Sequence, residues 1–115
     1  MKLTVLHNPR CRKSREALSI LEAADKQYDI REYLKNPLSK DELIVVLKKL
    51  NLRPIDIVRR GEKVFKEQFK GKDLTDEQWV DVLIKYPILI ERPIVIADEQ
   101  AVVGRPSEKI KPLLA

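Results

Sequence analysis

The order of hydrophobic patterns in the first 33 residues constrains the fold most narrowly. Residues 3–6 form a short apolar run that ends at a His-Asn-Pro turn, which predicts a buried strand. Residues 13–24 carry apolar side chains at helical spacing, and residues 27–33 alternate as a second strand would. Because parallel strands need a crossover of this kind, the pattern indicates a βαβ unit.

The middle of the chain predicts helices only. Residues 39–42 and 75–78 both have capping-box spacing, with Ser or Thr followed three residues later by Glu or Gln. Pro87 ends this region. The predicted helical segments span residues 39–50, 54–58, 62–69 and 75–86.

The last part of the chain returns to strand patterns. Two apolar runs, residues 93–97 and 101–104, flank a polar turn and predict a β-hairpin. Pro106 suits the first position of a final helix. The complete order predicts an α/β fold, a thioredoxin-like mixed four-stranded sheet with a helical insertion at about residues 39–86. We expect one domain over residues 1–115, which is long enough for a single core.

Composition excludes several classes of function. Charged residues make up 36% of the chain, and no run approaches the roughly 20 apolar residues of a membrane span. We therefore expect a cytoplasmic protein with no membrane partner. The net charge of +5 suits an anionic ligand, but aromatic residues are only 5%, which offers few stacking platforms for nucleic acid. We expect no nucleic-acid partner.

The single cysteine, Cys11, lies where the first turn meets the first helix. A helix N-terminus offers unpaired N–H groups and a positive dipole end, which stabilise a thiolate and an oxyanion alike. Such surroundings lower a cysteine pKa from about 8.5 to roughly 3.5–7.5. A buried, unreactive thiol is the alternative, and the basic neighbours argue against it. Four basic residues share this turn: Arg10, Arg12, Lys13 and Arg15.

His7 and Ser14 are the other polar residues near Cys11. We expect His7 to support the thiolate electrostatically, the alternative being a turn residue bound to backbone. One Cys and one His cannot complete a tetrahedral zinc site, so we expect no metal. Ser14 can supply a hydroxyl donor, and it stands where a Cys-x-x-Cys motif would have its second thiol. Any disulfide formed by Cys11 must therefore be resolved by an outside thiol.

Residues 7–18, His-Asn-Pro-Arg-Cys-Arg-Lys-Ser-Arg-Glu-Ala-Leu, resemble the H-N-P-x-C-x-x-S-R-x-x-L segment of the glutaredoxin-coupled arsenate reductase family, ArsC. The resemblance continues through residues 33–37 and 41–43. It returns at residues 87–95, Pro-Ile-Leu-Ile-Glu-Arg-Pro-Ile-Val, and at residues 104–108, Gly-Arg-Pro-Ser-Glu. The segments span nearly the whole chain in the expected order.

Membership in this family implies a thioredoxin-like fold with a helical insertion. It also implies that Arg59, Arg92 and Arg105 converge on the nucleophile Cys11. Arg60 is the alternative to Arg59. Pro93 would be the cis-proline beside the active cysteine. The implied catalytic residues are Cys11, His7, Arg59, Arg92 and Arg105, and the implied substrate-binding residues are Asn8, Arg10, Ser14 and the same three arginines.

The resemblance implies an arsenate reductase that binds no cofactor and uses glutathione as a co-substrate. For a chain of this size we expect a monomer. Cys11 would attack arsenate, glutathione would reduce the adduct to arsenite, and glutaredoxin would clear the resulting disulfide. Arg10, Arg12 and Lys13 make the loop more basic than small neutral residues would, and they could select a different oxyanion.

Two other functions are compatible with parts of this pattern. Spx-like regulators, which bind RNA polymerase, share the fold and the Arg-Pro-Ile segment. They generally carry Cys-x-x-Cys and lack the Gly-Arg-Pro-Ser segment, so both features favour the reductase. A general glutathione-dependent thiol reductase would use the same Cys11, and the sequence does not separate it from an arsenate reductase.

Overall fold

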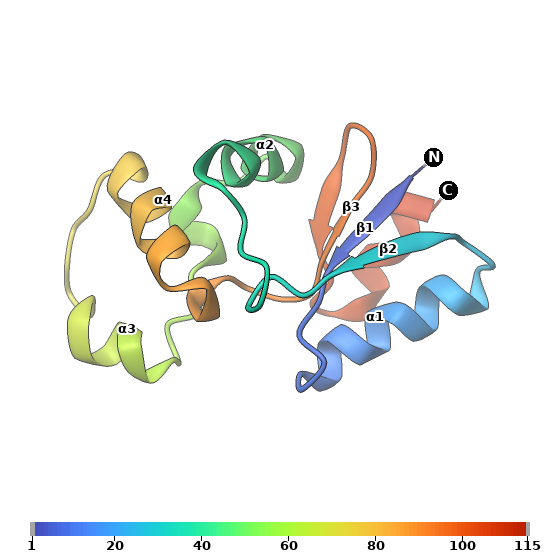
Figure 1. The fold of residues 1–115 in the computed structure, drawn as a ribbon, viewed down its shortest axis with the longest axis horizontal. Helices are drawn as coiled ribbons and strands as arrows, with labels where there is room; N and C mark the ends of the chain where they lie inside the picture. Colours follow the sequence, from blue (N-terminus) through green and yellow to red (C-terminus); the bar gives the residue numbers. More distant parts are fainter. Residues whose placement is uncertain (1, 115) are drawn as a thin grey trace. The chain divides into compact units, whose positions relative to one another are not determined.

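The computed structural model describes residues 2–114, which form two compact units. Residues 2–36 and 92–114 form the first, here called the sheet unit. Pro37–Glu91 form the second, here called the helical unit (Figure 1). No helix within residues 2–114 is long and apolar enough to cross a membrane.

The sheet unit contains a four-stranded sheet in the order β2-β1-β3-β4. Strand β1 (Leu3–Leu6) pairs in parallel with β2 (Tyr28–Arg31), and the crossover between them is helix α1 (Arg12–Ala23). On its other edge β1 pairs antiparallel with β3 (Ile94–Ile96), which forms a hairpin with β4 (Ala101–Val103). The predicted mixed α/β sheet, its βαβ unit and its hairpin are confirmed.

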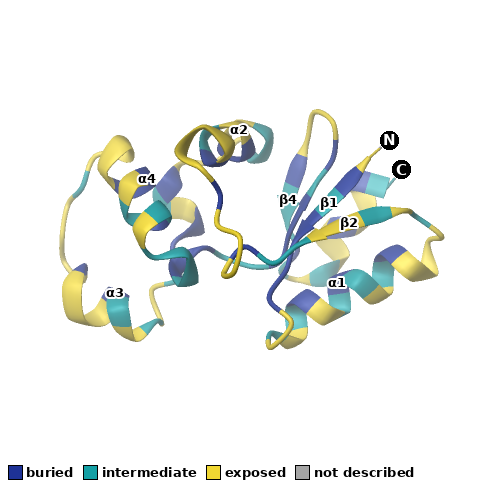
Figure 2. Ribbon diagram, in the orientation of Figure 1, coloured by how far each residue is buried: buried dark blue, intermediate teal, exposed yellow. Residues whose placement is uncertain are grey.

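One face of this sheet carries the core of the sheet unit. Val5 and Val95 are directly opposite across β1 and β3, and both are fully buried. Helix α1 and the 3₁₀ segment η3 (Ser107–Leu114) pack against them, as the dark blue positions in Figure 2 show. Each such side chain stabilises the fold by about 1.5–3 kcal/mol. The buried cluster consists of Leu3, Val5, Ala17, Leu21, Val95, Ala97, Ile110 and Leu113.

The helical unit begins its two longest helices with the predicted capping boxes. The Ser39 hydroxyl accepts the Glu42 N–H at 3.1 Å, and the Glu42 carboxylate accepts the Ser39 N–H at 2.9 Å. Thr75 and Gln78 repeat this exchange. Because each pair satisfies two N–H groups at a helix start, the helix boundary is fixed locally. The elements are α2 (Lys40–Leu50), η1 (Pro54–Ile57), α3 (Lys63–Gln68), α4 (Asp76–Lys85) and η2 (Pro87–Leu89).

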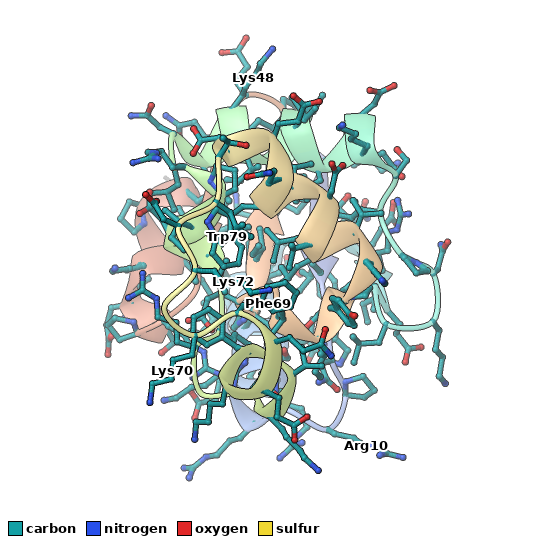
Figure 3. All side chains as sticks on the ribbon, turned by 90° about the vertical axis from the view of Figure 1, so that its left-hand side faces the viewer. Arg10, Lys48, Phe69, Lys70, Lys72 and Trp79 are labelled. Atoms are coloured by element: carbon teal, nitrogen blue, oxygen red, sulfur yellow. The ribbon has the colours of Figure 1, made fainter. Side chains whose placement is uncertain are left out.

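Aromatic side chains join α3 and α4. The ring of Trp79 stacks on Phe65 with centroids 6.2 Å apart and contacts Phe69 at 5.9 Å. Phe69 also meets Tyr86 edge-on at 5.7 Å. Figure 3 shows Phe69 and Trp79 in this group. Such pairs contribute about 0.5–1.5 kcal/mol beyond the area they bury, so they hold the short helix α3 in place.

Two predicted elements differ from the structure by more than one residue at an end or in the type of helix. Strand β2 ends at Arg31, not at residue 33, because the Glu32 carbonyl accepts the N–H groups of Lys35 and Asn36 and turns the chain. The last helical segment begins after Pro106, whose carbonyl accepts the Lys109 N–H at 3.1 Å. That segment is a 3₁₀ helix and contains Pro112, which has no N–H for an α-helical bond.

Candidate active site

Asn8 organises the turn between β1 and α1. Its carbonyl oxygen accepts the Cys11 N–H at 2.9 Å, and its Oδ1 accepts the Arg10 N–H at 3.1 Å. The buried N–H of Asn8 donates to Ser14 Oγ at 3.3 Å. These bonds fix the backbone on both sides of Cys11. The thiol therefore has a defined place at the N-cap of α1.

The Cys11 thiol is half-buried, and hydrogen bonds to its sulfur decide its charge. Burial raises the pKa of Cys11, but bonds from the Ser14 N–H, the Arg92 side chain, the Lys13 N–H and the Ser14 hydroxyl outweigh that effect. Each donor favours the thiolate over the thiol. Together they lower the pKa of Cys11 to about 7. About half of the sulfur is then thiolate, the nucleophilic form, at neutral pH.

Two arginines from the β3–β4 hairpin meet at this sulfur. Arg105 Nη2 donates to Cys11 Sγ at 3.4 Å, and the Arg92 side chain also hydrogen-bonds it. Arg105 Nε donates to the Arg92 carbonyl oxygen at 2.6 Å, which ties the two residues together. They come together because Ile94 and Val103, each two residues away along the chain, are partners in the hairpin. Two guanidinium groups at one sulfur can hold an oxyanion beside it.

Pro93 and Gly104 are the chain neighbours of these two arginines: Pro93 follows Arg92, and Gly104 precedes Arg105. The Arg92–Pro93 peptide bond is cis, the geometry that the family resemblance predicts. The Gly104 N–H donates to the Pro93 carbonyl oxygen at 2.8 Å. A Cβ at position 104 would lie 3.1 Å from Pro93 Cγ and 2.9 Å from Ile110 Cδ1, so the close contact requires glycine. Sequence reasoning did not assign Gly104 a role, and a glycine at a strand end beside Arg105 was the signal available.

The surroundings of His7 disfavour its charged form. Its side chain is buried, and Nδ1 has no hydrogen-bond partner among residues 2–114. Burial lowers the pKa of His7 from its ordinary value of 6.5, Arg15 acts in the same direction, and Glu32 and a backbone bond with Ser14 oppose them. The electrostatic support that we expect His7 to give the thiolate stays a prediction.

Arg59 belongs to the helical unit, where two carboxylates bind it. Its Nη1 lies 3.1 Å from Glu91 Oε1, and its Nε lies 3.2 Å from Glu62 Oε1. Arg60, next in the chain, is exposed. The assignment of Arg59, or of Arg60 in its place, to the Cys11 site stays a prediction.

The predicted substrate-binding residues of the turn fall into two groups. Asn8 and Ser14 are buried and shape the backbone around Cys11. Arg10 is exposed, and Figure 3 shows its side chain reaching away from the ribbon. Within residues 2–114 no group of three His, Cys, Asp or Glu side chains is arranged to hold a metal ion.

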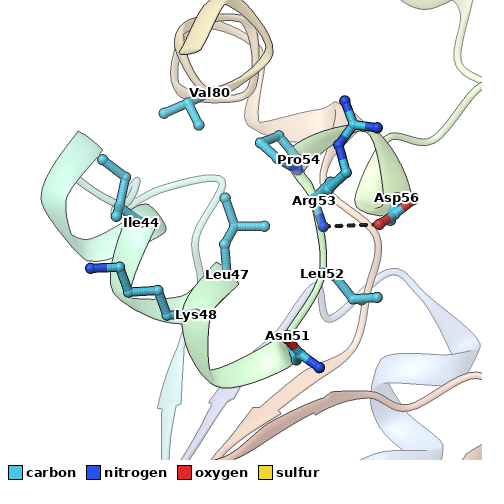
Figure 4. Close-up of a pocket in the computed structure, with 9 residues that line it drawn as sticks. All are labelled: Ile44, Leu47, Lys48, Asn51, Leu52, Arg53, Pro54, Asp56 and Val80. Atoms are coloured by element: carbon cyan, nitrogen blue, oxygen red, sulfur yellow. Dashed lines mark hydrogen bonds between the residues drawn. The ribbon is translucent and has the colours of Figure 1, made fainter. Parts of the chain in front are cut away.

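The helical unit has a pocket of its own, of about 520 Å³ (Figure 4). Leu47, Leu52 and Val80 give it an apolar lining, and the Arg53 N–H donates to Asp56 Oδ2 at 2.9 Å at its rim. None of the predicted site residues lines this pocket. The chemistry that the sequence indicates therefore belongs to the turn at Cys11 and not to this pocket.

Comparison with known proteins identifies the family. Residues 6–113 match the ArsC family. The chain belongs to the ArsC family. It is 36% identical to an arsenate reductase of Neisseria meningitidis, over 98% of both chains. It is 39% identical to an uncharacterised protein from the glnII region of Streptomyces viridochromogenes, over 94% of this chain and 95% of that one.

A solved ArsC-family structure has the same architecture. The arsenate reductase from Vibrio cholerae superimposes with a TM-score of 0.91 over 97% of each chain, at 35% identity. The thioredoxin-like fold expected from the sequence is thus the fold of the chain.

Proposed function

We propose that this ArsC-family chain reduces arsenate to arsenite, with Cys11 as the nucleophile. The observation that carries the proposal is the Cys11 sulfur bound by both Arg92 and Arg105. A thiolate and an oxyanion repel one another, so cations must offset both charges as they meet. The arsenate reductases among the relatives support arsenate as that oxyanion.

In the first step the Cys11 thiolate forms a bond to arsenic. One arsenate oxygen takes up two protons and leaves as water, and the arsenic stays As(V). Arg92 and Arg105 can each donate two parallel hydrogen bonds to the remaining oxygens. Donors already placed where negative charge develops lower the barrier without further reorganisation. The buried His7 and Asn8 keep the turn in position during this step.

In the second step glutathione supplies the electrons. Its thiolate attacks Cys11 Sγ, a disulfide forms, and the electron pair of the breaking Sγ–As bond stays on arsenic, which leaves as As(III) arsenite. A glutaredoxin thiol then exchanges with the mixed disulfide and restores Cys11. Because the chain has a single cysteine, both thiols come from outside it. The scheme needs no bound cofactor and one copy of the chain, and it suits the reducing cytoplasm.

The test is arsenate-dependent NADPH oxidation with glutathione, glutaredoxin and glutathione reductase, together with direct measurement of arsenite. We expect the wild type to form arsenite and Cys11→Ser to form none. Arg92→Ala and Arg105→Ala should each lose about 10²–10³-fold in kcat, the usual cost of removing one oxyanion donor. The matched control is Lys26→Ala, which removes a cation from the loop that follows the C-terminal end of α1. Failure of the wild type to form arsenite would contradict the proposal.

A general glutathione-dependent thiol reductase is the second candidate. The observation that favours it is the pKa of Cys11 at about 7, which activates the sulfur with no oxyanion present. Such an enzyme would reduce a small disulfide with glutathione and would form no arsenite. Measuring both reactions with the same preparation separates the two functions.

A further inference from the structure

Four cations surround Cys11 without binding its sulfur. The side chains that hydrogen-bond the sulfur belong to Ser14, Arg92 and Arg105. The four cations of the turn make no such bond through their side chains among the contacts of residues 2–114. Stabilising the thiolate therefore does not account for them. We call this group the basic rim, and it consists of Arg10, Arg12, Lys13 and Arg15.

Most of the positive charge of the basic rim is not neutralised by nearby carboxylates. Arg12 Nε and Lys13 Nζ lie 3.3 Å and 3.5 Å from the carboxylate of Glu16, so two cations share one anion. Arg15 Nη1 donates to the neutral carbonyl of Pro9 at 2.9 Å. The exposed Arg10 has no ion pair among residues 2–114. The four cations of the rim and the carboxylate of Glu16 therefore sum to a net charge of +3. This charge lies beside a nucleophile whose pKa is lowered by other groups.

We infer that the basic rim binds the carboxylates of the small thiol that attacks the Cys11 adduct, an inference that rests on the proposed function. The incoming thiolate must reach a sulfur already joined to an anionic arsenate group. Cations along its path reduce that repulsion and raise the encounter rate. Arg10 and Arg12 suit this position, because they are the two chain neighbours of Cys11 and both are exposed.

The size of the rim favours a small thiol over a protein. Its cations lie within four residues of Cys11, on one turn and the start of one helix. A stable protein–protein interface covers about 800 Å² on each partner, far more than this turn presents. A carboxylate-bearing small thiol such as glutathione needs only two or three cations within reach of its thiol. The ligand class is therefore a small anionic thiol.

The test uses a thiol–disulfide exchange that needs no arsenate. Cys11 thiolate attacks oxidised glutathione, one half joins Cys11 as a mixed disulfide, and the other half leaves as glutathione thiolate. We compare its rate constant with that for the ethyl ester of oxidised glutathione, whose carboxylates are capped, at pH 7 and low salt. The ratio of the two rates isolates recognition of the carboxylates, since both reagents meet the same thiolate.

We expect the double variant Arg10→Ser, Arg12→Ser to lower this ratio about tenfold, and high salt to lower the wild-type ratio similarly. Lys26→Ser, which removes a cation from the loop that follows the C-terminal end of α1, should leave the ratio unchanged. Mass spectrometry of the mixed disulfide gives both rates.

Three results would overturn the inference. An unchanged ratio would mean that the rim is only a solvated surface. An equal loss with both reagents would mean that the rim acts on the thiolate itself. The same rate measurement is made with oxidised glutaredoxin in place of oxidised glutathione. If the double variant lowers only the rate with glutaredoxin, the rim binds a protein and not a small thiol. A tenfold fall in the ratio from a wild type that forms no arsenite would refute the arsenate proposal alone and support the small-thiol site.

Discussion

The sheet unit and the helical unit differ in what they bury. The buried polar side chains of residues 2–114 are His7, Asn8 and Ser14, and all three lie in the sheet unit within four residues of Cys11. The buried side chains of the helical unit are apolar or aromatic. A buried polar group left without a partner costs about 1–3 kcal/mol. Their concentration at one turn indicates that this turn serves chemistry, whereas the helical unit is organised around packing.

Arg59 is a partly buried charged residue of the helical unit. Its side chain is 21% exposed, and its guanidinium is shared between Glu62 and Glu91. Arg92 and Arg105 in the sheet unit instead direct donors at a sulfur. The contrast shows that an arginine in a family motif has a role set by the acceptors around it. The guanidinium of Arg59 is occupied by two carboxylates, whereas those of Arg92 and Arg105 lie beside the thiolate that would meet a substrate.

The largest expected effect tests the packing of the helical unit. Leu83→Ala removes a fully buried side chain and should lower the free energy of unfolding by about 2–5 kcal/mol. Urea denaturation followed by circular dichroism measures this. If packing and chemistry are divided as described, the pKa of Cys11 in the folded variant stays near 7. A rise in the Cys11 pKa comparable to that expected for Arg92→Ala would contradict this division between the two units.

Arg92→Ala tests the opposite side of the comparison. Removing a donor to the sulfur should raise the pKa of Cys11 from about 7 toward the ordinary value of about 8.5. At pH 7 the thiolate fraction, and with it the alkylation rate, then falls several-fold. Arg53→Ala, an exposed arginine of the helical unit, is the matched control. Equal pKa values in Arg92→Ala and the wild type would contradict the electrostatic account of the site.

The smallest expected effect concerns the helix caps. Ser39→Ala removes the hydroxyl that accepts the Glu42 N–H and should cost about 1 kcal/mol of stability. Thr75→Ala, at the start of α4, should cost a similar amount. Thermal unfolding measures both, and thiol reactivity should not change in either variant. A loss below about 0.3 kcal/mol in both would mean that the caps do not stabilise the helical unit.

Local patterns predicted much of the fold. Capping boxes at Ser39 and Thr75 located α2 and α4 because the signal lies within four residues. The end of β2 was misplaced because it depends on which N–H groups reach the Glu32 carbonyl. The last segment was predicted as an ordinary helix, although Pro112 was a signal against that.

The candidate site was predictable as a set of residues but not as a set of bonds. Cys11 and its neighbours follow from the turn, whereas Arg92 and Arg105 entered through family resemblance. The bond from Arg105 to the Arg92 carbonyl and the closeness of Gly104 to Pro93 depend on how the hairpin packs. The lowered pKa of His7 depends on burial, which a single histidine in a turn does not disclose.

The central claim is that Cys11 is a thiolate activated by bonds from Arg92, Ser14 and the start of α1. The most direct test is the rate of iodoacetamide alkylation of the wild-type chain between about pH 5 and pH 10. The thiolate alone reacts, so the rate follows its fraction and rises with pH. We predict a midpoint near pH 7. A midpoint at about 8.5, the value of an ordinary thiol, would contradict the claim.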